Sequence, residues 1–460
     1  MLIICIGDGS EQASYSAQNI AHSQNLEYRG VLDAHTQIQT GVYHTSHYDI
    51  TSQELLDIAG DAQLIELDSA DPAFLSSIGQ HPVMQYLTEN KSFCGAAFGA
   101  LVQNHDGEGY RFCCYQNKLL TTKSFDYSND IMNGVRQDMI AGNPIAQCEI
   151  CTTRENNNLP SPRQLRTKQM VELSSFRSVK EFVDNNTVFD YDIRTGNRCN
   201  AQCRMCCVDD SHLLDKEFYK LGITDKLAGL SPPTNFAIVD IPNVKRLYVA
   251  GGEPTISREF IDFLKECVEQ NRTDFLLQIN TNAFVLSKKF LDIIKHFSNV
   301  EFIVSVDGFE DALYYIRYPI TWDKLAKNIC TLDGCGRVCF NISVSIYNAA
   351  RLYPLVNYLN TQYTNSTVLI NWVDEPSYMW FGNHPNKTAV TLDCQKLMST
   401  TSYRTDHNFN TCVNHIIKTI KNNDIDHETL KTFFEFNNKL DVNRNIRLQD
   451  YLPEIIGPIV

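Results

Sequence analysis

The chain has 460 residues, more than one ordinary domain needs, so two to four units and a large buried core are expected. Its 40 basic and 54 acidic residues give a formal charge of −14 without a basic run, which disfavours nucleic acids and anionic membranes as partners. The apolar start over residues 1–7 has no basic region and is too short for a signal peptide, and no later stretch is long enough to span a bilayer. We therefore expect a cytoplasmic protein, in which clustered cysteines bind metals more often than they form disulfides.

The first 80 residues alternate between strand-like and helical patterns. In chain order, a strand, two helices and a second strand are predicted over 1–7, 13–24, 52–58 and 62–67. We predict a small α/β unit over residues 1–85, and its residues define no role for it.

Residues 86–165 have the pattern of a hairpin followed by a helix. Two β-like runs, over 93–103 and 110–115, are joined by a glycine-containing turn. A helix is predicted over 130–141, because a Gly-Asn-Pro sequence follows and would end it. Residues 160–185 are polar and carry two prolines, which predicts a linker.

Four cysteines of this segment could form a metal site. Cys94 lies near one end of the predicted hairpin, Cys113 lies on its second strand, and Cys148 and Cys151 form a CxxC pair after the helix. Four thiolates suit a second iron–sulfur cluster, and zinc is the alternative metal. Cys114 adjoins Cys113 and could replace it as the ligand, although we prefer Cys113.

From residue 188 onward, apolar runs alternate with helical patterns, which indicates βα units around a parallel sheet. In a barrel of such units, functional residues lie at the carboxyl ends of the strands. Strands are predicted over 188–193, 244–250, 275–280, 300–306, 338–346 and 367–373. Helices are predicted over 257–270, 287–296, 321–332 and 350–359.

The first of these strands runs into three cysteines with CxxxCxxC spacing, Cys199, Cys203 and Cys206. Three thiolates on one short loop can bind three irons of a cubane cluster and leave the fourth iron open to a small molecule. Structural zinc is the alternative, but its ligands usually come as two separated pairs. We interpret Cys207 as a neighbour rather than a ligand, because Cys206 already completes the spacing.

The second strand ends in Gly251-Gly252-Glu253-Pro254. Two glycines let the backbone approach a ligand closely, and the carboxylate could accept hydrogen bonds from an ammonium group. A plain turn would also explain glycine and proline here.

The next two strands end in polar residues. Asn280 ends the third strand, and Ser305 and Asp307 end the fourth, where they could bind a ligand or cap the following turn. Arg317 follows, and its guanidinium could pair with a ligand carboxylate or form a surface salt bridge.

These motifs carry a resemblance to a known family. The run from Tyr191 to Cys206 and the GGEP sequence resemble the cluster loop and SAM-binding motif of radical S-adenosylmethionine (SAM) enzymes. More narrowly, the chain resembles the twitch-domain, or SPASM-like, group, and its tail from Leu440 to Glu454 is similar to the ending of that group. The resemblance implies an α/β fold: a partial (β/α)6 TIM-like barrel over 180–385, preceded by the small α/β unit and a hairpin-plus-helix twitch segment over 86–165, and followed by a helical extension over 386–460.

The resemblance also implies a radical SAM activity. In that superfamily, a [4Fe-4S] cluster on cysteines matching Cys199, Cys203 and Cys206 chelates SAM and reductively cleaves it to methionine and a 5′-deoxyadenosyl radical, which abstracts hydrogen from a substrate. The expected substrate is a peptide, a protein or a small metabolite, and the expected electron donor is a flavodoxin or ferredoxin. The alternative is an iron–sulfur electron carrier or zinc scaffold that does not cleave SAM.

Site residues follow from the same resemblance, although none is assigned to catalysis. SAM would be bound by Gly251, Gly252, Glu253, Pro254, Asn280, Ser305, Asp307 and Arg317. The twitch segment would hold an auxiliary [4Fe-4S] cluster on Cys94, Cys113 (or Cys114), Cys148 and Cys151, and its other matching residues are Arg136, Gly142, Arg154, Glu155, Ser161 and Arg163.

Overall fold

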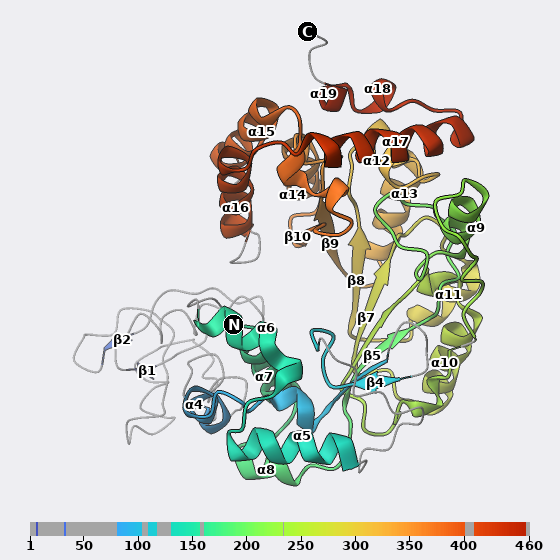
Figure 1. Ribbon diagram of the computed structural model, residues 1–460. Helices are drawn as coiled ribbons and strands as arrows, with labels where there is room; N and C mark the ends of the chain where they lie inside the picture. Colours follow the sequence, from blue (N-terminus) through green and yellow to red (C-terminus); the bar gives the residue numbers. More distant parts are fainter. Residues whose placement is uncertain are drawn as a thin grey trace. The chain divides into compact units, whose positions relative to one another are not determined.

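The computed structural model (Figure 1) describes residues 6–7, 32–33, 81–103, 109–116, 130–156, 161–232, 234–400 and 409–456. Apart from a short parallel pair, β1 (Ile6–Gly7) and β2 (Leu32–Asp33), the elements predicted for the first 80 residues lie outside the described residues, as does most of the hairpin turn. Within the described ranges, no helix is both long enough and apolar enough to cross a membrane.

The chain divides into two compact units. The first comprises Met1–Leu101, Arg111–Leu120 and Asp126–Asp190, and the second comprises Val102–Tyr110, Thr121–Phe125 and Tyr191–Val460.

Helices dominate the described part of the first unit. The predicted helix over 130–141 is confirmed, since α5 has these bounds and buries Met132 and Met139 on one side. The rings of Phe93 and Phe98 stack 5.4 Å apart in the core. The elements are α4 (Pro82–Glu89), η1 (Gly95–Phe98), α5 (Asp130–Ala141), η2 (Ala146–Cys148), α6 (Glu149–Asn156), α7 (Pro162–Leu173) and α8 (Val179–Asp184).

The predicted linker over 160–185 is wrong, because α7 and α8 occupy most of it. Ser161 and Gln164 form a capping box: the Ser161 hydroxyl accepts from the Gln164 N–H at 3.2 Å, and the Gln164 side chain accepts from the Ser161 N–H at 2.9 Å. Pro162 sits in the first turn, where its missing N–H costs nothing. The proline that suggested a linker therefore begins a helix.

The predicted hairpin is only partly present in the described residues. The helix η1 replaces the first half of its first strand, and β3 (Ala100–Gln103) begins after Gly99. A Cβ on Gly99 would lie 2.3 Å from the Phe189 ring. The small residues at this point therefore allow close packing, which an extended strand of larger residues would prevent. The returning strand β4 covers Tyr110–Arg111 and is a neighbour of β3.

The second unit is built on an eight-stranded sheet with the order β10-β9-β8-β7-β6-β5-β3-β4. The pairs from β6 to β10 are parallel, and strands consecutive in the chain are neighbours, as in a barrel. The order is linear, so the barrel is partial, and the predicted α/β class with a parallel sheet is confirmed. The strands are β5 (Asp190–Arg194), β6 (Arg246–Ala250), β7 (Leu276–Thr281), β8 (Val300–Ser305), β9 (Arg337–Val344) and β10 (Thr367–Trp372).

Helices follow the strands, and α10 shows why they pack on the sheet. It buries Phe260, Phe263, Leu264 and Cys267, which recur at the spacing of one helix face, and it lies beside α11 (Figure 1). The sequence predicts neither α9 nor α12. The helices are α9 (His212–Lys220), α10 (Arg258–Glu269), α11 (Lys288–Ile294), α12 (Asp311–Ile316), α13 (Trp322–Asp333), α14 (Leu352–Gln362), α15 (Lys387–Thr400), α16 (Phe409–Asn422), α17 (His427–Arg444), α18 (Leu448–Tyr451) and α19 (Pro453–Ile456), with short 3-10 turns η3 (Phe236–Ile238), η4 (Pro254–Ile256), η5 (Ser377–Met379) and η6 (Phe381–Asn383).

The long helix α17 belongs to the core of this unit. Its Phe433, Phe436 and Leu440 join one apolar cluster with Phe218 of α9 and Tyr315 of α12. The rings of Phe218 and Phe436 meet edge to face at 5.6 Å. Apolar burial thus fixes α17 against the helices that follow the first and fourth strands of the barrel.

The stability of this unit should depend on pH through one buried histidine, His384. His384 is 0% exposed; its Nδ1 accepts from the Asn386 N–H at 3.1 Å, and its Nε2 has no partner among the described residues. Burial lowers the pKa of His384 to about 4 from the usual 6.5. Below pH 6.5 the unfolded chain therefore takes up a proton that the folded chain refuses, so stability is lost as the pH falls from 6.5 towards 4.

We expect the free energy of unfolding to fall by ~2 kcal/mol between pH 7.5 and 5 through this residue. His384→Asn keeps an acceptor for the Asn386 N–H and removes the titration, so its urea-unfolding free energy should depend less on pH in that range. The exposed His296→Gln variant serves as the control. Equal pH slopes for H384N and wild type would contradict the assignment.

Candidate functional site

The loops after β5 and β6 are joined through their main chains. The Thr195 N–H donates to the Ala250 carbonyl at 2.8 Å, and the Gly252 N–H donates to the Gly196 carbonyl at 2.7 Å. The Glu253 N–H then donates to the Arg198 carbonyl at 2.9 Å. The segment before Cys199 is therefore held against the GGEP segment at the carboxyl ends of adjacent strands.

The two glycines are required by this contact. Gly251 has φ +131°, which side chains rarely adopt, and a Cβ on it would lie 2.8 Å from the Gly196 carbonyl oxygen. A Cβ on Gly252 would lie 2.4 Å from the Arg198 carbonyl oxygen. The close approach visible here is thus between two loops of the chain itself.

The three cysteines of the loop over residues 199–206, here called the cluster loop, are largely removed from water. Cys199 and Cys203 are buried, and Cys206 is partly buried. Burial raises the pKa of Cys199 to about 12, and it also raises the pKa of Cys203, where the nearby Arg317 guanidinium opposes the effect. Without a metal the thiols stay protonated, so metal binding would release protons.

Two side chains that the sequence did not single out contact Cys199. His212, at the start of α9, accepts from the Cys199 N–H through Nδ1 at 3.2 Å. The Asn282 amide lies 3.7 Å from the Cys199 sulfur and donates to the Asn200 side chain at 2.8 Å. Asn282 lies two residues after the predicted site residue Asn280, whereas nothing in the sequence around His212 pointed to this contact.

Glu253 is 1% exposed, and its carboxylate is surrounded by donors. Its Oε1 accepts from the Thr255 N–H at 3.1 Å and from the hydroxyls of Thr255 and Thr281, each at 2.7 Å. Its Oε2 accepts from the Asn282 N–H at 2.7 Å and keeps capacity for a further donor. Burial raises the pKa of Glu253, while these hydrogen bonds oppose the rise. Pro254, the next residue, begins η4.

Asp307 and Arg317 form a buried ion pair after β8. Arg317 Nη1 lies 2.5 Å from Asp307 Oδ2, and Asp307 Oδ1 accepts from the Ser343 N–H at 2.8 Å. Burial would lower the pKa of Arg317, but Cys203, Asp307 and Cys206 raise it, so the guanidinium stays charged. The Arg317 Nε is buried with no partner in the part of the chain that the structure describes. The Arg317 guanidinium therefore has one N–H group, at Nε, that is available to a ligand.

Asn280 and Ser305 lie side by side on β7 and β8. The Ser305 hydroxyl donates to the Asn280 side-chain oxygen at 3.3 Å. This bond joins two of the predicted SAM-binding residues.

The four cysteines predicted to form the second site line one cavity of the first unit. It has a volume of about 240 Å³, and Cys94, Cys113, Cys148 and Cys151 all contribute to its wall. Burial raises the pKa of Cys148 to about 12 and that of Cys151 to about 11. Cys114 is exposed and is not among the lining residues.

Two buried arginines hold the segments that carry these cysteines. Arg163 pairs with Glu155 through two nitrogens, at 2.9 and 2.7 Å, and donates to the Phe93 carbonyl at 2.8 Å, directly before Cys94. Arg136 donates to the Ala97 carbonyl at 2.8 Å. Ser161 also donates to Glu155, at 2.5 Å. Of the residues that matched the twitch group, Glu155, Ser161 and Arg163 therefore contact one another.

In the ranges that the structure describes, no three or more His, Cys, Asp or Glu side chains are placed so that they could hold a single metal ion. The assignment of the two sets of cysteines to clusters accordingly stays a prediction.

Comparison with known proteins gives one family match. The model of the radical SAM superfamily matches residues 193–346, from the end of β5 to the residues that follow β9. Among curated proteins, no match was found.

Several solved structures are weakly similar. SuiB of Streptococcus suis bound to S-adenosylmethionine has 14% identity and a TM-score of 0.28 over 58% of this chain and 50% of SuiB. Native anSMEcpe with bound AdoMet has 15% identity and a TM-score of 0.34 over 44% of this chain and 58% of that one. TsrM of Kitasatospora setae, a radical S-adenosylmethionine methyltransferase with cobalamin and a [4Fe-4S] cluster bound, has 12% identity and a TM-score of 0.31 over 46% of this chain and 42% of that one.

The chain thus spans about half the length of the solved structures it matches, and TM-scores below 0.5 carry no argument about function. The family match does carry one, because it contains the three-cysteine loop, the GGEP segment and the Asp307–Arg317 pair. Residues 193–346 of the chain therefore form a domain that matches the radical SAM superfamily.

Proposed function

We propose that Cys199, Cys203 and Cys206 hold a [4Fe-4S] cluster with one iron free to bind SAM. The donor set supports this, because three thiols lie on one loop and all are at least partly buried. When bound, the cluster and SAM supply the radical chemistry: one electron cleaves SAM to methionine and a 5′-deoxyadenosyl radical, which takes a hydrogen atom from the substrate. The observation that carries the proposal is the main-chain pairing of residues 195–198, directly before the cluster loop, with Ala250 and the GGEP segment inside the matched domain.

The buried charges beside the loop support a SAM site. Glu253 Oε2 retains capacity to accept a hydrogen bond, which suits the amino group of SAM. Arg317 Nε is an unused donor next to the cysteines, which suits a carboxylate. Asp307 then acts by orienting Arg317, since the two form a bond of 2.5 Å. The remaining predicted SAM-binding residues are Gly251, Gly252, Pro254, Asn280 and Ser305.

We also propose that Cys94, Cys113, Cys148 and Cys151 hold an auxiliary [4Fe-4S] cluster. All four line the same cavity, and its volume of about 240 Å³ gives a metal group space between them. Cys113 lines the cavity whereas Cys114 is exposed, which favours Cys113 as the fourth ligand. The cluster would relay an electron or anchor the substrate.

The substrate is proposed to be a peptide, a protein or a small metabolite, with a flavodoxin or ferredoxin as the electron donor. The formal net charge of −14 disfavours nucleic acid as the substrate, so it is not proposed. An electron carrier or zinc scaffold would leave SAM intact, so SAM cleavage separates these readings from the enzyme.

Replacement of one cluster ligand tests the first site. After anaerobic reconstitution with iron and sulfide, the reduced wild type should convert SAM to 5′-deoxyadenosine, and Cys206→Ala should fall to the background of unreconstituted protein, because the cluster loses a ligand. The adjacent Cys207→Ala is the matched control and should retain the activity. Chromatographic measurement of 5′-deoxyadenosine decides between them; no product from loaded, reduced wild type would contradict the proposal.

The second site can be counted alone in a variant that lacks Cys199, Cys203 and Cys206. That variant should keep about four irons per chain after reconstitution. Adding Cys113→Ala should remove most of this iron, whereas adding Cys114→Ala should not. Metal analysis that finds zinc in place of iron, or equal effects of the two substitutions, would refute the auxiliary-cluster assignment as stated.

A further inference from the structure

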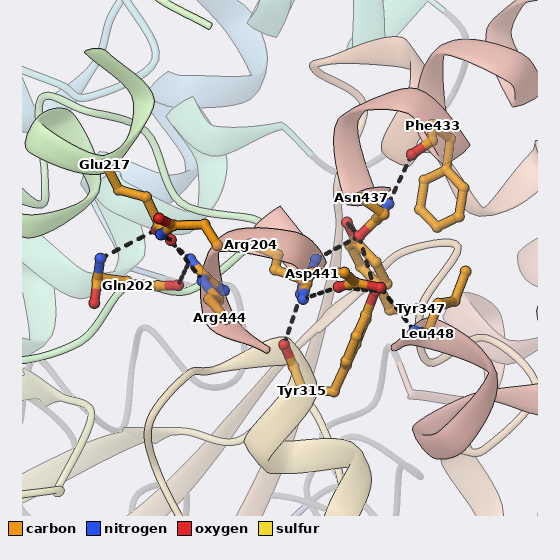
Figure 2. A network of polar contacts seen from close by, with 11 residues as sticks. Gln202, Arg204, Glu217, Tyr315, Tyr347, Phe433, Asn437, Asp441, Arg444 and Leu448 are labelled. Atoms are coloured by element: carbon orange, nitrogen blue, oxygen red, sulfur yellow. Dashed lines mark hydrogen bonds and ion pairs between the residues drawn. The ribbon is translucent and has the colours of Figure 1, made fainter. Parts of the chain in front are cut away.

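A second support of the cluster loop comes from helix α17, far outside the matched domain. Asn437, Asp441 and Arg444 recur at helical spacing on this helix, and each is at most 8% exposed. Figure 2 shows their side chains directed toward residues of the cluster loop and of α9 and α12. Three polar side chains on one buried helix face need polar partners, because unpaired burial is costly.

The main partner is Arg204, which lies between Cys203 and Cys206 and is 0% exposed. Its Nη1 donates to Asn437 Oδ1 at 2.8 Å, and its Nη2 lies 2.5 Å from Asp441 Oδ1 (Figure 2). Its guanidinium also lies 3.7 Å from the centre of the Tyr315 ring. Arg204 is therefore held by two side chains of α17 and by the Tyr315 ring.

Asp441 connects this arginine to the rest of the network. It accepts from the Tyr315 hydroxyl at 3.0 Å, and its Oδ2 accepts from the Leu448 N–H at 2.7 Å. The carboxylate thus bonds the cluster loop, α12 and the chain after α17 at one point. The loss of one member of such a buried network leaves a charge without its partner.

Arg444 holds the loop at the residue before Cys203. It pairs with Glu217 of α9 through two nitrogens, at 2.9 and 2.6 Å, and donates to the Gln202 carbonyl at 2.9 Å. From the other side, the Gln202 and Arg204 N–H groups donate to the carbonyls of Tyr318 and Ile316, at 2.7 and 2.8 Å. The main chain around Cys203 is therefore held on both sides.

We propose that Arg204, Asn437, Asp441 and Arg444 are positioning residues that let α17 set the geometry of the cluster loop. The inference rests on the proposed SAM cluster and extends it to a helix about 80 residues beyond the end of the matched domain, which is at residue 346. Its physical basis is that Arg204, placed between two proposed ligands, cannot move without breaking bonds to two helices, α12 and α17. Removal of this support should change the cluster and its response to SAM while most of the fold persists.

The test uses Asp441→Asn in the full-length, reconstituted protein. We expect a 5′-deoxyadenosine rate that is about 10- to 100-fold lower, together with an altered electron paramagnetic resonance (EPR) spectrum of the reduced cluster before and after SAM addition. The matched control is Glu454→Gln, which breaks another C-terminal ion pair, Glu454–Arg351 at 2.5 Å, that does not touch the cluster loop. The control should keep the wild-type spectrum.

A gentler variant guards against misfolding of D441N. Tyr315→Phe removes the hydroxyl bonded to Asp441 and keeps the ring beneath Arg204. It should therefore shift the EPR spectrum and the KM for SAM in the same direction as D441N does, by a smaller amount. Unchanged spectra and KM in both variants would overturn the positioning role, even if their folded fraction fell.

The two proposals fail differently. A wild type that binds a cluster but yields no 5′-deoxyadenosine would refute the radical SAM activity, while the EPR spectra of D441N and wild type would still decide the role of α17. A wild type that cleaves SAM, beside a D441N variant with wild-type rate and spectrum, would refute the positioning role alone.

Discussion

The constraint on which the site depends is the contact between two main chains at the carboxyl ends of β5 and β6. The loop that carries Cys199 and the GGEP segment are bonded through backbone groups, and neither Gly251 nor Gly252 leaves room for a side chain. Because backbone groups make this contact, it fixes the main-chain positions of Cys199 and Glu253. It does so without using the side chains that the chemistry needs. Those side chains remain free to serve a ligand or to be held by their neighbours.

Charge is the second organising feature around this contact. Three buried acids near the loop have an arginine partner: Asp307 pairs with Arg317, Glu217 with Arg444, and Asp441 with Arg204. Glu253 differs from these three, since in the described part of the chain its partners are hydroxyl and backbone N–H groups rather than a cation. A carboxylate that is buried with donors but with no counter-charge is a suitable place for a ligand ammonium, because the ligand would supply the missing positive charge.

Sequence patterns predicted the barrel well and the polar support poorly. Apolar runs located the strands from β5 to β10 within a few residues, because burial on a sheet is a local pattern. The prolines near residue 160 suggested a linker, whereas the capping box at Ser161 makes Pro162 the start of a helix. The bond between Arg204 and Asp441 joins residues 237 positions apart, and no periodicity or local motif predicts such a pair.

The two sets of cysteines pose the same mechanical problem and have the same kind of solution. Short cysteine-bearing loops have little apolar surface to fix them, so something else must hold their main chain. In the first unit Arg163 donates to the carbonyl before Cys94, while its charge is balanced by Glu155. In the second unit Arg444 donates to the carbonyl before Cys203, while Glu217 balances it.

The long, planar guanidinium suits this task, because it can satisfy a carboxylate and a backbone carbonyl at once, which a lysine ammonium does with less geometric control. A buried arginine, neutralised by an acid and bonded to the residue before a cysteine, is therefore a structural device that this chain uses twice. Its position cannot be read from the spacing of the cysteines, since the arginine and the acid come from helices elsewhere in each unit.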